Sequence, residues 1–441
     1  MLTRRRFLGY STAGLLTAAT GCTPPFLEDP ADRDAHSSGT VHPSLANKAG
    51  LARLKNRFLG YPVNLTMPSE EFFAWRQELQ SVGIGQFAYN NVGNPYKESA
   101  IPYNTHDLER ELIAGMSKLY AFPPQDIWGF LSHSGTDSNM HGMYMGRTLL
   151  QGRTGKLPKV YFTREAHYSI QILRDLLGLD AVFVDTLPDG GMDPSDLERK
   201  LADNVSRPAL VVATVGTTFK GAVDSLDRIR QALKGHSYYL HLDAALFGGY
   251  LPFTAHAGEV AYRSTADPGT PRYDSIAVSC HKFFGFPAPA GLFITTKSRF
   301  EEFNELFGRI HDPEYIHQVP GTITCSRDAV KPAEFYYFST PEAQERLARD
   351  ARSMLANTSW LMERMQSRFS GWQPARMNDL SNTVFFRRPS DRLVKKYSLA
   401  TMHLTIGSQR LDYAHVVIMP HADRGVLTEF LDDLEKDPPG F

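Results

Sequence analysis

The stretch Asp274-Ser-Ile-Ala-Val-Ser-Cys-His-Lys-Phe-Phe-Gly285 predicts a short buried strand that ends at a polar pair of residues. We expect the strand over Ile276 to Ser279, followed by His281, Lys282 and a turn rich in aromatic residues. Burial disfavours an ammonium group and lowers its pKa, and an imine-forming lysine needs a lowered pKa. For this pair alone, the alternative is a lysine that extends its charge from the strand end to solvent.

Strands and helices alternate on both sides of this stretch. Continuous apolar strands separated by helices predict a mostly parallel sheet that is covered on both faces. Ligands of such sheets bind beyond the carboxyl ends of the strands. Each expected strand ends in a polar cluster, and these strands are 127–131, 159–163, 209–213, 238–242 and 276–279.

Three of these clusters contain residues that can bind a ligand. Ser134-Gly135-Thr136 lies between a strand and a helix, where free backbone N–H groups favour an anion, although a simple helix cap has the same pattern. His167 follows a strand and could lie flat over an aromatic ligand, or it could be an ordinary core or surface histidine. Asp243 closes an apolar strand and needs a cation or a hydrogen-bond donor, so a structural ion pair with Lys282 is one interpretation.

Taken together, the clusters fit one cofactor better than they fit separate structural roles. Pyridoxal phosphate needs a lysine for its aldehyde, a carboxylate for its pyridine nitrogen, an anion cradle for its phosphate and a flat group against its ring. The candidates, in that order, are Lys282, Asp243, Ser134 to Thr136 with Ser279, and His167.

At these residues the chain resembles the group II pyridoxal-phosphate-dependent amino-acid decarboxylases, most closely the bacterial histidine decarboxylases. The resemblance covers about Gly60 to Leu434. The matching stretches are Trp128-Gly-Phe, Ser134-Gly-Thr-Asp-Ser-Asn-Met140, Gly146-Arg147, Ala166-His-Tyr-Ser169, Val215-Gly-Thr-Thr-Phe-Lys-Gly-Ala222, Tyr238-Tyr-Leu-His-Leu-Asp-Ala-Ala245, Asp274-Ser-Ile, Ser279-Cys-His-Lys282 and Pro287-Ala-Pro.

The resemblance implies a fold and a role for individual residues. The fold is an α/β fold of the type found in pyridoxal-phosphate (PLP)-dependent transferases (fold type I), with a mostly parallel seven-stranded sheet and a small C-terminal α+β domain. Lys282 carries the cofactor, Asp243 binds its ring nitrogen, and His167 stacks on the ring and touches the substrate. Tyr315 returns a proton to the substrate. The other implied cofactor-binding residues are Ser134, Gly135, Thr136, Ala245, Ser279, His281 and Ser326.

The same resemblance implies a homodimer in which the loop 310–328 completes the neighbour's site. The chain departs from the family at several positions beside the implied site. Asp137 replaces a glutamate, Cys280 and Cys325 replace glycines, and Asp328-Ala329 replaces Asn-Gly. These changes bear on the choice of substrate more than on cofactor binding.

The expected reaction is decarboxylation of an L-amino acid, with histidine converted to histamine. Alternatives are decarboxylation of serine or an aromatic amino acid, or an aminotransferase. An aminotransferase needs an arginine to bind the substrate carboxylate, and Arg387 is the only candidate. Arg388 and Pro389 indicate, however, that Arg387 lies at a strand end on the surface. A lipid-anchored binding protein without catalysis is the non-enzyme alternative. No metal site is expected, because no His-Glu-x-x-His pattern occurs.

Composition and the N-terminus set the context. The formal charge of −1 gives no nucleic-acid footprint, and three cysteines among 441 residues suggest no disulfide framework. Thr3-Arg-Arg-Arg-Phe-Leu8 matches a twin-arginine export signal, and Ala19-Thr-Gly-Cys22 resembles a lipoprotein cleavage box. We therefore expect export to the periplasm, with a possible lipid anchor at Cys22.

The expected divisions are a signal peptide (1–21), a tether (22–45), an N-terminal helical segment (46–104), a cofactor-binding domain (105–330) and a connecting helix with a small domain (331–441).

Overall fold

The computed structural model describes residues 44–265, 267–406 and 409–437. The expected signal peptide, most of the expected tether and Cys22 lie outside the described residues. The chain divides into two units at Lys55 and Asn56. The described part of the first unit contains helix α1 (Ser44–Arg53), which begins inside the expected tether. The predicted boundaries of the domains stay predictions.

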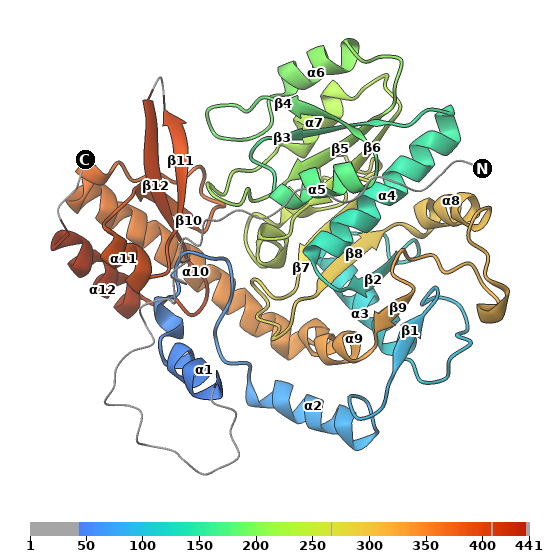
Figure 1. The fold of residues 1–441 in the computed structure, drawn as a ribbon, viewed down its shortest axis with the longest axis horizontal. Helices are drawn as coiled ribbons and strands as arrows, with labels where there is room; N and C mark the ends of the chain where they lie inside the picture. Colours follow the sequence, from blue (N-terminus) through green and yellow to red (C-terminus); the bar gives the residue numbers. More distant parts are fainter. Residues whose placement is uncertain (1–43, 266, 407–408, 438–441) are drawn as a thin grey trace, which may run out of the picture. The chain divides into compact units, whose positions relative to one another are not determined.

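The second unit is built on a seven-stranded sheet in the order β2-β8-β7-β6-β5-β3-β4 (Figure 1). Neighbours from β7 to β4 run parallel, whereas β8 is antiparallel to both β2 and β7. This confirms the mostly parallel sheet. The strands are β2 (Trp128–Ser132), β3 (Lys159–Thr163), β4 (Asp180–Val184), β5 (Ala209–Thr214), β6 (Tyr238–Asp243), β7 (Ser275–Ser279) and β8 (Gly291–Thr295).

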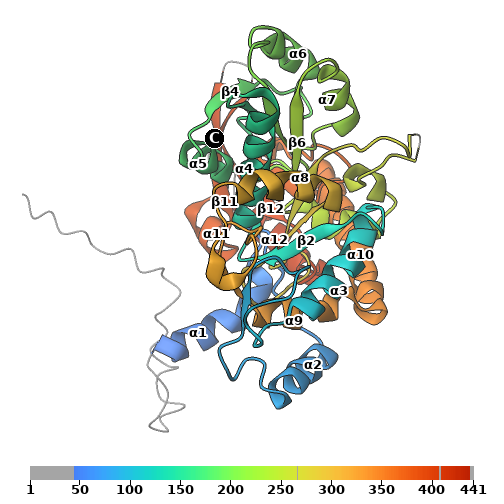
Figure 2. The ribbon, with the colours of Figure 1, turned by 90° about the vertical axis from the view of Figure 1, so that its right-hand side faces the viewer.

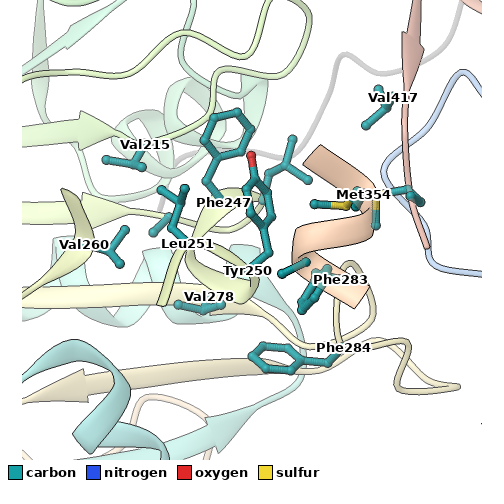
Figure 3. Packing of buried hydrophobic residues seen from close by; sticks show 14 of the residues in the cluster. Val215, Phe247, Tyr250, Leu251, Val260, Val278, Phe283, Phe284, Met354 and Val417 are labelled. Atoms are coloured by element: carbon teal, nitrogen blue, oxygen red, sulfur yellow. The ribbon is translucent and has the colours of Figure 1, made fainter. Parts of the chain in front are cut away.

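Apolar side chains project from both faces of the sheet, because successive residues of a strand point to opposite faces. Val160 and Phe162 belong to one core cluster and Tyr161 to the other. Helix α4 crosses the face of the first cluster and packs on β5 to β8, with α8 beside it (Figure 2). On the opposite face, Phe247, Tyr250 and Phe283 lie between the strands and the helix that carries Met354 (Figure 3).

The sheet is flanked by helices that follow the strands in the expected order. Their bounds are α2 (Glu70–Ser81), α3 (His106–Ser117), α4 (Gly135–Thr154), α5 (Tyr168–Leu176), α6 (Pro194–Ala202), α7 (Leu226–Ala232), α8 (Lys297–Gly308) and α9 (Val330–Phe335). Among the described residues, none of the helices combines the length and the apolar character needed to cross a lipid bilayer.

The C-terminal part forms a small α+β unit after the long helix α10 (Pro341–Arg368). Its antiparallel sheet has the order β10-β12-β11 and is accompanied by helices α11 and α12. The bounds are β10 (Thr383–Arg387), α11 (Asp391–Lys396), β11 (Ala400–Ile406), β12 (Gln409–Val417) and α12 (Arg424–Glu435).

Local expectations fail at three places. Gly308, Pro313, Pro320 and Gly321 predict a loop over residues 305–332, but β9 (Ser326–Asp328) pairs antiparallel with β1 (Asn90–Val92), and α9 begins at Val330. The polar, turn-rich sequence from Asn90 to Tyr103 also predicts a loop, although its first three residues form β1. Thr105 precedes α3 but does not cap it, because its hydroxyl donates to the carbonyl of Ala329 at 2.6 Å. At all three places, contacts between residues far apart in the sequence determine the local structure.

Candidate active site

The carboxyl ends of five strands meet at one edge of the large sheet. Strands β2, β3, β5, β6 and β7 all point the same way, because β8 reverses direction between β2 and β7. Their last residues are Ser132, Thr163, Thr214, Asp243 and Ser279. The turn after β7 that contains Lys282, the start of α4 and the link between β3 and α5 that contains His167 all follow from this edge.

Lys282 lies three residues beyond the end of β7. The residue is half-buried, and burial of its amine lowers the pKa, whereas the nearby Asp243 carboxylate opposes this change. Its Nζ atom makes no hydrogen bond or ion pair with any residue that the structure describes. A lowered pKa places more of the amine in the neutral, nucleophilic form.

The backbone at Lys282 is held by Asn64, which sequence reasoning did not identify. The N–H of Asn64 donates to the carbonyl of Lys282 at 3.3 Å, and its side-chain amide donates to the carbonyl of Phe283 at 2.8 Å. Gly285 closes the turn by donating to the Lys282 carbonyl at 3.2 Å. No local pattern around Asn64 signals this contact, because its partners lie more than 200 positions later.

Asp243 is 3% exposed and closes β6 beside Thr214 of β5. Its Oδ1 accepts the N–H of Ala245 at 3.1 Å, and its carbonyl accepts the N–H of Val215 at 2.9 Å. Its carboxylate forms no ion pair within the described part of the chain. Both the functional and the structural interpretation of Asp243 require a positive partner, and the ion pair with Lys282 does not form.

The start of α4 forms the expected cradle. Ser134 caps the helix, and its hydroxyl accepts the N–H of Asp137 at 3.2 Å. A Cβ atom added at Gly135 would collide with Oγ of Ser279 and would lie 3.6 Å from Cβ of Ala245. Gly135, Ala245 and Ser279 are therefore immediate neighbours. Thr136 is exposed in the first turn of the same helix.

His167 is the N-cap residue of α5, and its hydrogen bonds define its tautomer. Its Nδ1 accepts the N–H of Ser169 at 3.2 Å, so the neutral ring carries its proton on Nε2. Burial lowers the pKa of His167; Asp243 raises it and Lys282 lowers it further. Asp243 and Lys282 therefore lie close enough to His167 to influence its charge.

Burial also affects His281 and Cys280, the two residues that precede Lys282. Nδ1 of His281 lies 3.3 Å from the carbonyl of Ala290, and the pKa of His281 is lowered by burial. The Cys280 thiol is fully buried, and burial raises its pKa well above the usual value. Cys280 therefore resembles a small apolar core residue more than a reactive thiol.

Two predicted site residues are not brought to this cluster. The side chain of Tyr315, in the short helix η7 (Glu314–Ile316), is 80% exposed. Ser326 is exposed in β9, where its hydroxyl accepts from Asn90 at 3.3 Å. Cys325 is also exposed. The same loop does approach the cradle at one point, where the Thr324 hydroxyl lies 3.4 Å from Oδ1 of Asp137.

Sequence reasoning also missed polar groups at the strand ends. The hydroxyl groups of Thr163 and Thr214 are buried and have no hydrogen-bond partner among the described residues. The buried Asp224 carboxylate accepts the N–H groups of Thr214 and Met192, both at 2.7 Å. The polar character of the strand ends is a weak signal for these residues, since many parallel sheets have polar strand ends.

The residues present fit pyridoxal phosphate. Among the described residues, the Lys282 amine has no hydrogen-bond or ion-pair partner and the buried Asp243 carboxylate has no counter-charge. The lack of a side chain at Gly135 lets the Ser279 hydroxyl lie directly against the start of α4. These are the amine, the carboxylate and the anion cradle that this cofactor requires.

Comparisons with known proteins agree with this geometry. The model of the pyridoxal-dependent decarboxylase conserved domain matches residues 102–320. The histidine decarboxylase of Solanum lycopersicum is 30% identical over 395 residues, covering 88% of this chain and 86% of that protein. Serine decarboxylase 1 of Oryza sativa subsp. japonica is 30% identical over 422 residues, covering 93% of this chain and 80% of that protein.

A solved structure shares the fold. The L-methionine decarboxylase from Streptomyces sp. 590 superposes with a TM-score of 0.75 at 21% identity, covering 93% of this chain and 98% of that one. The expected family, fold and cofactor are thereby confirmed. The chain belongs to the group II pyridoxal-phosphate-dependent decarboxylases and is an amino-acid decarboxylase that uses pyridoxal phosphate.

Proposed function

We propose that this enzyme converts L-histidine to histamine and CO2. Support comes from the motifs that resemble histidine decarboxylases and from the similarity to the Solanum lycopersicum enzyme. L-Serine is the second candidate, because a serine decarboxylase is equally identical over a larger share of the chain. The observation that carries the reaction itself is the convergence of Lys282, Asp243 and His167 at one sheet edge.

The proposed roles follow from the positions of the side chains. Lys282 would hold the cofactor through its amine, whose lowered pKa favours the neutral, nucleophilic form. Asp243 would keep the ring nitrogen of the cofactor protonated. Ser134, Gly135, Thr136, Ser279 and His281 would hold the phosphate, and Ala245 would contact the ring.

When bound, pyridoxal phosphate supplies a protonated ring that accepts the electron pair left by departing CO2. His167 would lie against this ring, and its Nε2–H would be available to donate to the substrate, because Nδ1 already accepts the N–H of Ser169. Tyr315 delivers the proton that replaces the carboxylate at Cα. Since Tyr315 is 80% exposed, it acts only after its loop closes over a site.

We propose a homodimer in which the loop 310–328, with Tyr315 and Ser326, completes the neighbour's site. The exposure of both side chains supports this assignment. Sedimentation of the holoenzyme should give twice the chain mass. Mixing two inactive variants, Tyr315→Phe and Lys282→Ala, should restore activity in the mixed dimer. No recovery in a confirmed mixed dimer would contradict the shared site.

We also propose export through the twin-arginine route, supported by Thr3-Arg-Arg-Arg-Phe-Leu8. In cell fractionation the wild type should appear outside the cytoplasm. The variant Arg4→Lys with Arg5→Lys should accumulate inside, and Cys22→Ala should abolish any attachment of labelled lipid. Equal export of the arginine variant would refute the route.

The substrate assignment is tested by measuring CO2 release from each of the twenty amino acids by the reconstituted enzyme. We expect kcat/KM for L-histidine to exceed that for any other amino acid by at least about tenfold, which corresponds to about 1.4 kcal/mol of transition-state binding. A preference for L-serine would select the second candidate. Activity with neither would overturn both.

A further inference from the structure

His167 lies in a short link between β3 and α5 whose own backbone contacts are few. The turn closes through one hydrogen bond, from the N–H of Ala166 to the carbonyl of Thr163 at 3.2 Å. Arg164 lies over the ring of Phe183 with its guanidinium carbon 4.2 Å from the centroid. On its other side His167 begins α5, where its carbonyl accepts the N–H of Ile170 at 3.0 Å and its Nδ1 accepts the N–H of Ser169. On the β3 side, the backbone of the link is held by that single turn hydrogen bond among the described residues, so a further attachment on this side helps to define where His167 lies.

An ion pair supplies this second attachment. Nζ of Lys220 lies 2.6 Å from Oε1 of Glu165, two positions before His167, and both side chains are 21% exposed. The residues are 55 positions apart and come from two different strand-end loops. A short pair of partly buried charges is less screened than an exposed surface pair.

Lys220 is a rigid attachment point because its loop is fixed at the base. The loop 215–223 folds back as a hairpin, in which the N–H groups of Gly216 and Thr217 both donate to the carbonyl of Ala222. Asp224 closes the base by bonding both the N–H and the carbonyl of Thr214.

The loop is also fixed on both sides of Lys220 by the C-terminal part of the chain. Nδ1 of His415 lies 2.7 Å from the carbonyl of Phe219, and the two rings stack with centroids 4.5 Å apart. The side chain of Asn378 donates to the carbonyl of Gly221 at 3.2 Å. Neighbours on each side of Lys220 are therefore anchored.

The same loop contacts the other half of the site. The N–H of Val215 donates to the carbonyl of Asp243 at 2.9 Å, so one loop connects Asp243 at its base with the His167 link at its tip. We propose that Glu165 and Lys220 are positioning residues that hold His167 in register with Asp243 over the cofactor. This inference rests on the proposed role of His167 and on no choice of substrate.

The test compares Lys220→Met, Glu165→Gln and the reversed pair Glu165→Lys with Lys220→Glu. Lys297→Met, which removes the exposed Lys297–Glu301 pair on α8, is the matched control. The readouts are the circular dichroism of the bound-cofactor absorption band, kcat and KM for the best substrate, and the melting temperature.

We expect Lys220→Met to lower kcat by about 10- to 100-fold with KM changed less than about threefold, since misorientation removes stabilisation made in the transition state. The cofactor band should lose much of its ellipticity while the melting temperature stays close to that of Lys297→Met. The reversed pair should recover both kcat and ellipticity.

Unchanged ellipticity and kcat in a folded Lys220→Met variant would overturn the proposal, as would failure of the folded reversed pair to recover either. The ellipticity is measured without substrate. If the wild type binds cofactor but decarboxylates no amino acid, the proposed function fails while the ellipticity series still decides the positioning role.

Discussion

At position 135, the absence of a side chain lets the Ser279 hydroxyl lie directly against the start of α4. A Cβ there would collide with Ser279 Oγ, so the Ser279 hydroxyl and the start of α4 would have to move apart. We predict that Gly135→Ala weakens pyridoxal phosphate binding to the apoprotein by at least about tenfold, or about 1.4 kcal/mol. Fluorescence titration of the apoprotein measures this loss.

Gly371→Ala is the control for this substitution, because a Cβ at Gly371 meets nothing within 4 Å. It should bind cofactor as the wild type does. Equal affinities of the two variants would show that Gly135 does not shape the phosphate site.

The lowered pKa of Lys282 predicts a distinct pH dependence. The neutral amine is the reactive form, and burial favours it at a lower pH than the ordinary lysine value of 10.5. The rate at which the apoprotein attaches pyridoxal phosphate covalently should therefore rise with pH through a midpoint below 10.5. Stopped-flow absorbance measures the rate, and Lys282→Arg should show no attachment. A midpoint at or above 10.5 would contradict the burial effect.

Among the connecting elements, the loop after β5 depends on Asp224. Burial raises the pKa of this carboxyl from 3.8 to about 6, and Asp189 adds to the effect. Because the folded value exceeds the unfolded one, the contribution to stability is complete below pH 3.8 and is lost as pH rises through 6. The stability advantage over Asp224→Asn should shrink by up to about 3 kcal/mol between pH 4 and pH 7.

Denaturant unfolding of both proteins at several pH values checks this prediction. Other titrating groups are common to the two proteins and cancel in the difference. A difference in stability that stays constant, or that grows with rising pH, would show that folding does not raise the pKa of Asp224.

Strand β9 is joined to helix α3 by a fully buried ion pair. Nη1 of Arg327 lies 2.5 Å from Oε1 of Glu109, which also accepts the N–H of Leu131 at 3.0 Å. Removing one partner leaves a buried charge uncompensated. We predict that Arg327→Met lowers the free energy of unfolding by about 3–5 kcal/mol.

The double variant Arg327→Met with Glu109→Gln tests the reason for this loss. It should be more stable than Arg327→Met alone, because no unpaired charge remains, and urea unfolding measures both. A double variant less stable than the single one would mean that packing, not charge, holds strand β9 against helix α3.

Over the whole chain, patterns within a single strand or helix were enough to predict most of the sheet. Polar residues after apolar runs located Lys282, Asp243 and His167, because parallel strands deliver their ends to one edge. No local pattern predicts strand β8 or strand β11, and the sequence predicts a loop where β9 forms. The pairing of β9 with β1 joins residues more than 230 positions apart, which no local pattern records.

The contacts that position the site residues also join residues far apart in the sequence. Asn64 holds the backbone of Lys282, and Lys220 reaches Glu165, in each case across a large separation in sequence. Residue chemistry indicates what a side chain can do, whereas the tertiary fold decides which side chains meet. The motifs therefore indicate decarboxylation, whereas the preference for histidine over serine, which they favour by resemblance, stays a proposal.

The central claim is that the Lys282 amine is the covalent attachment point of the cofactor. Borohydride reduction of the folded holoenzyme, followed by peptide mass spectrometry, tests it most directly. We predict one pyridoxyl group per chain, located on the peptide that contains Lys282, and none in Lys282→Ala. Modification of another lysine, or a colourless wild-type protein with Lys282 unmodified, would contradict the account.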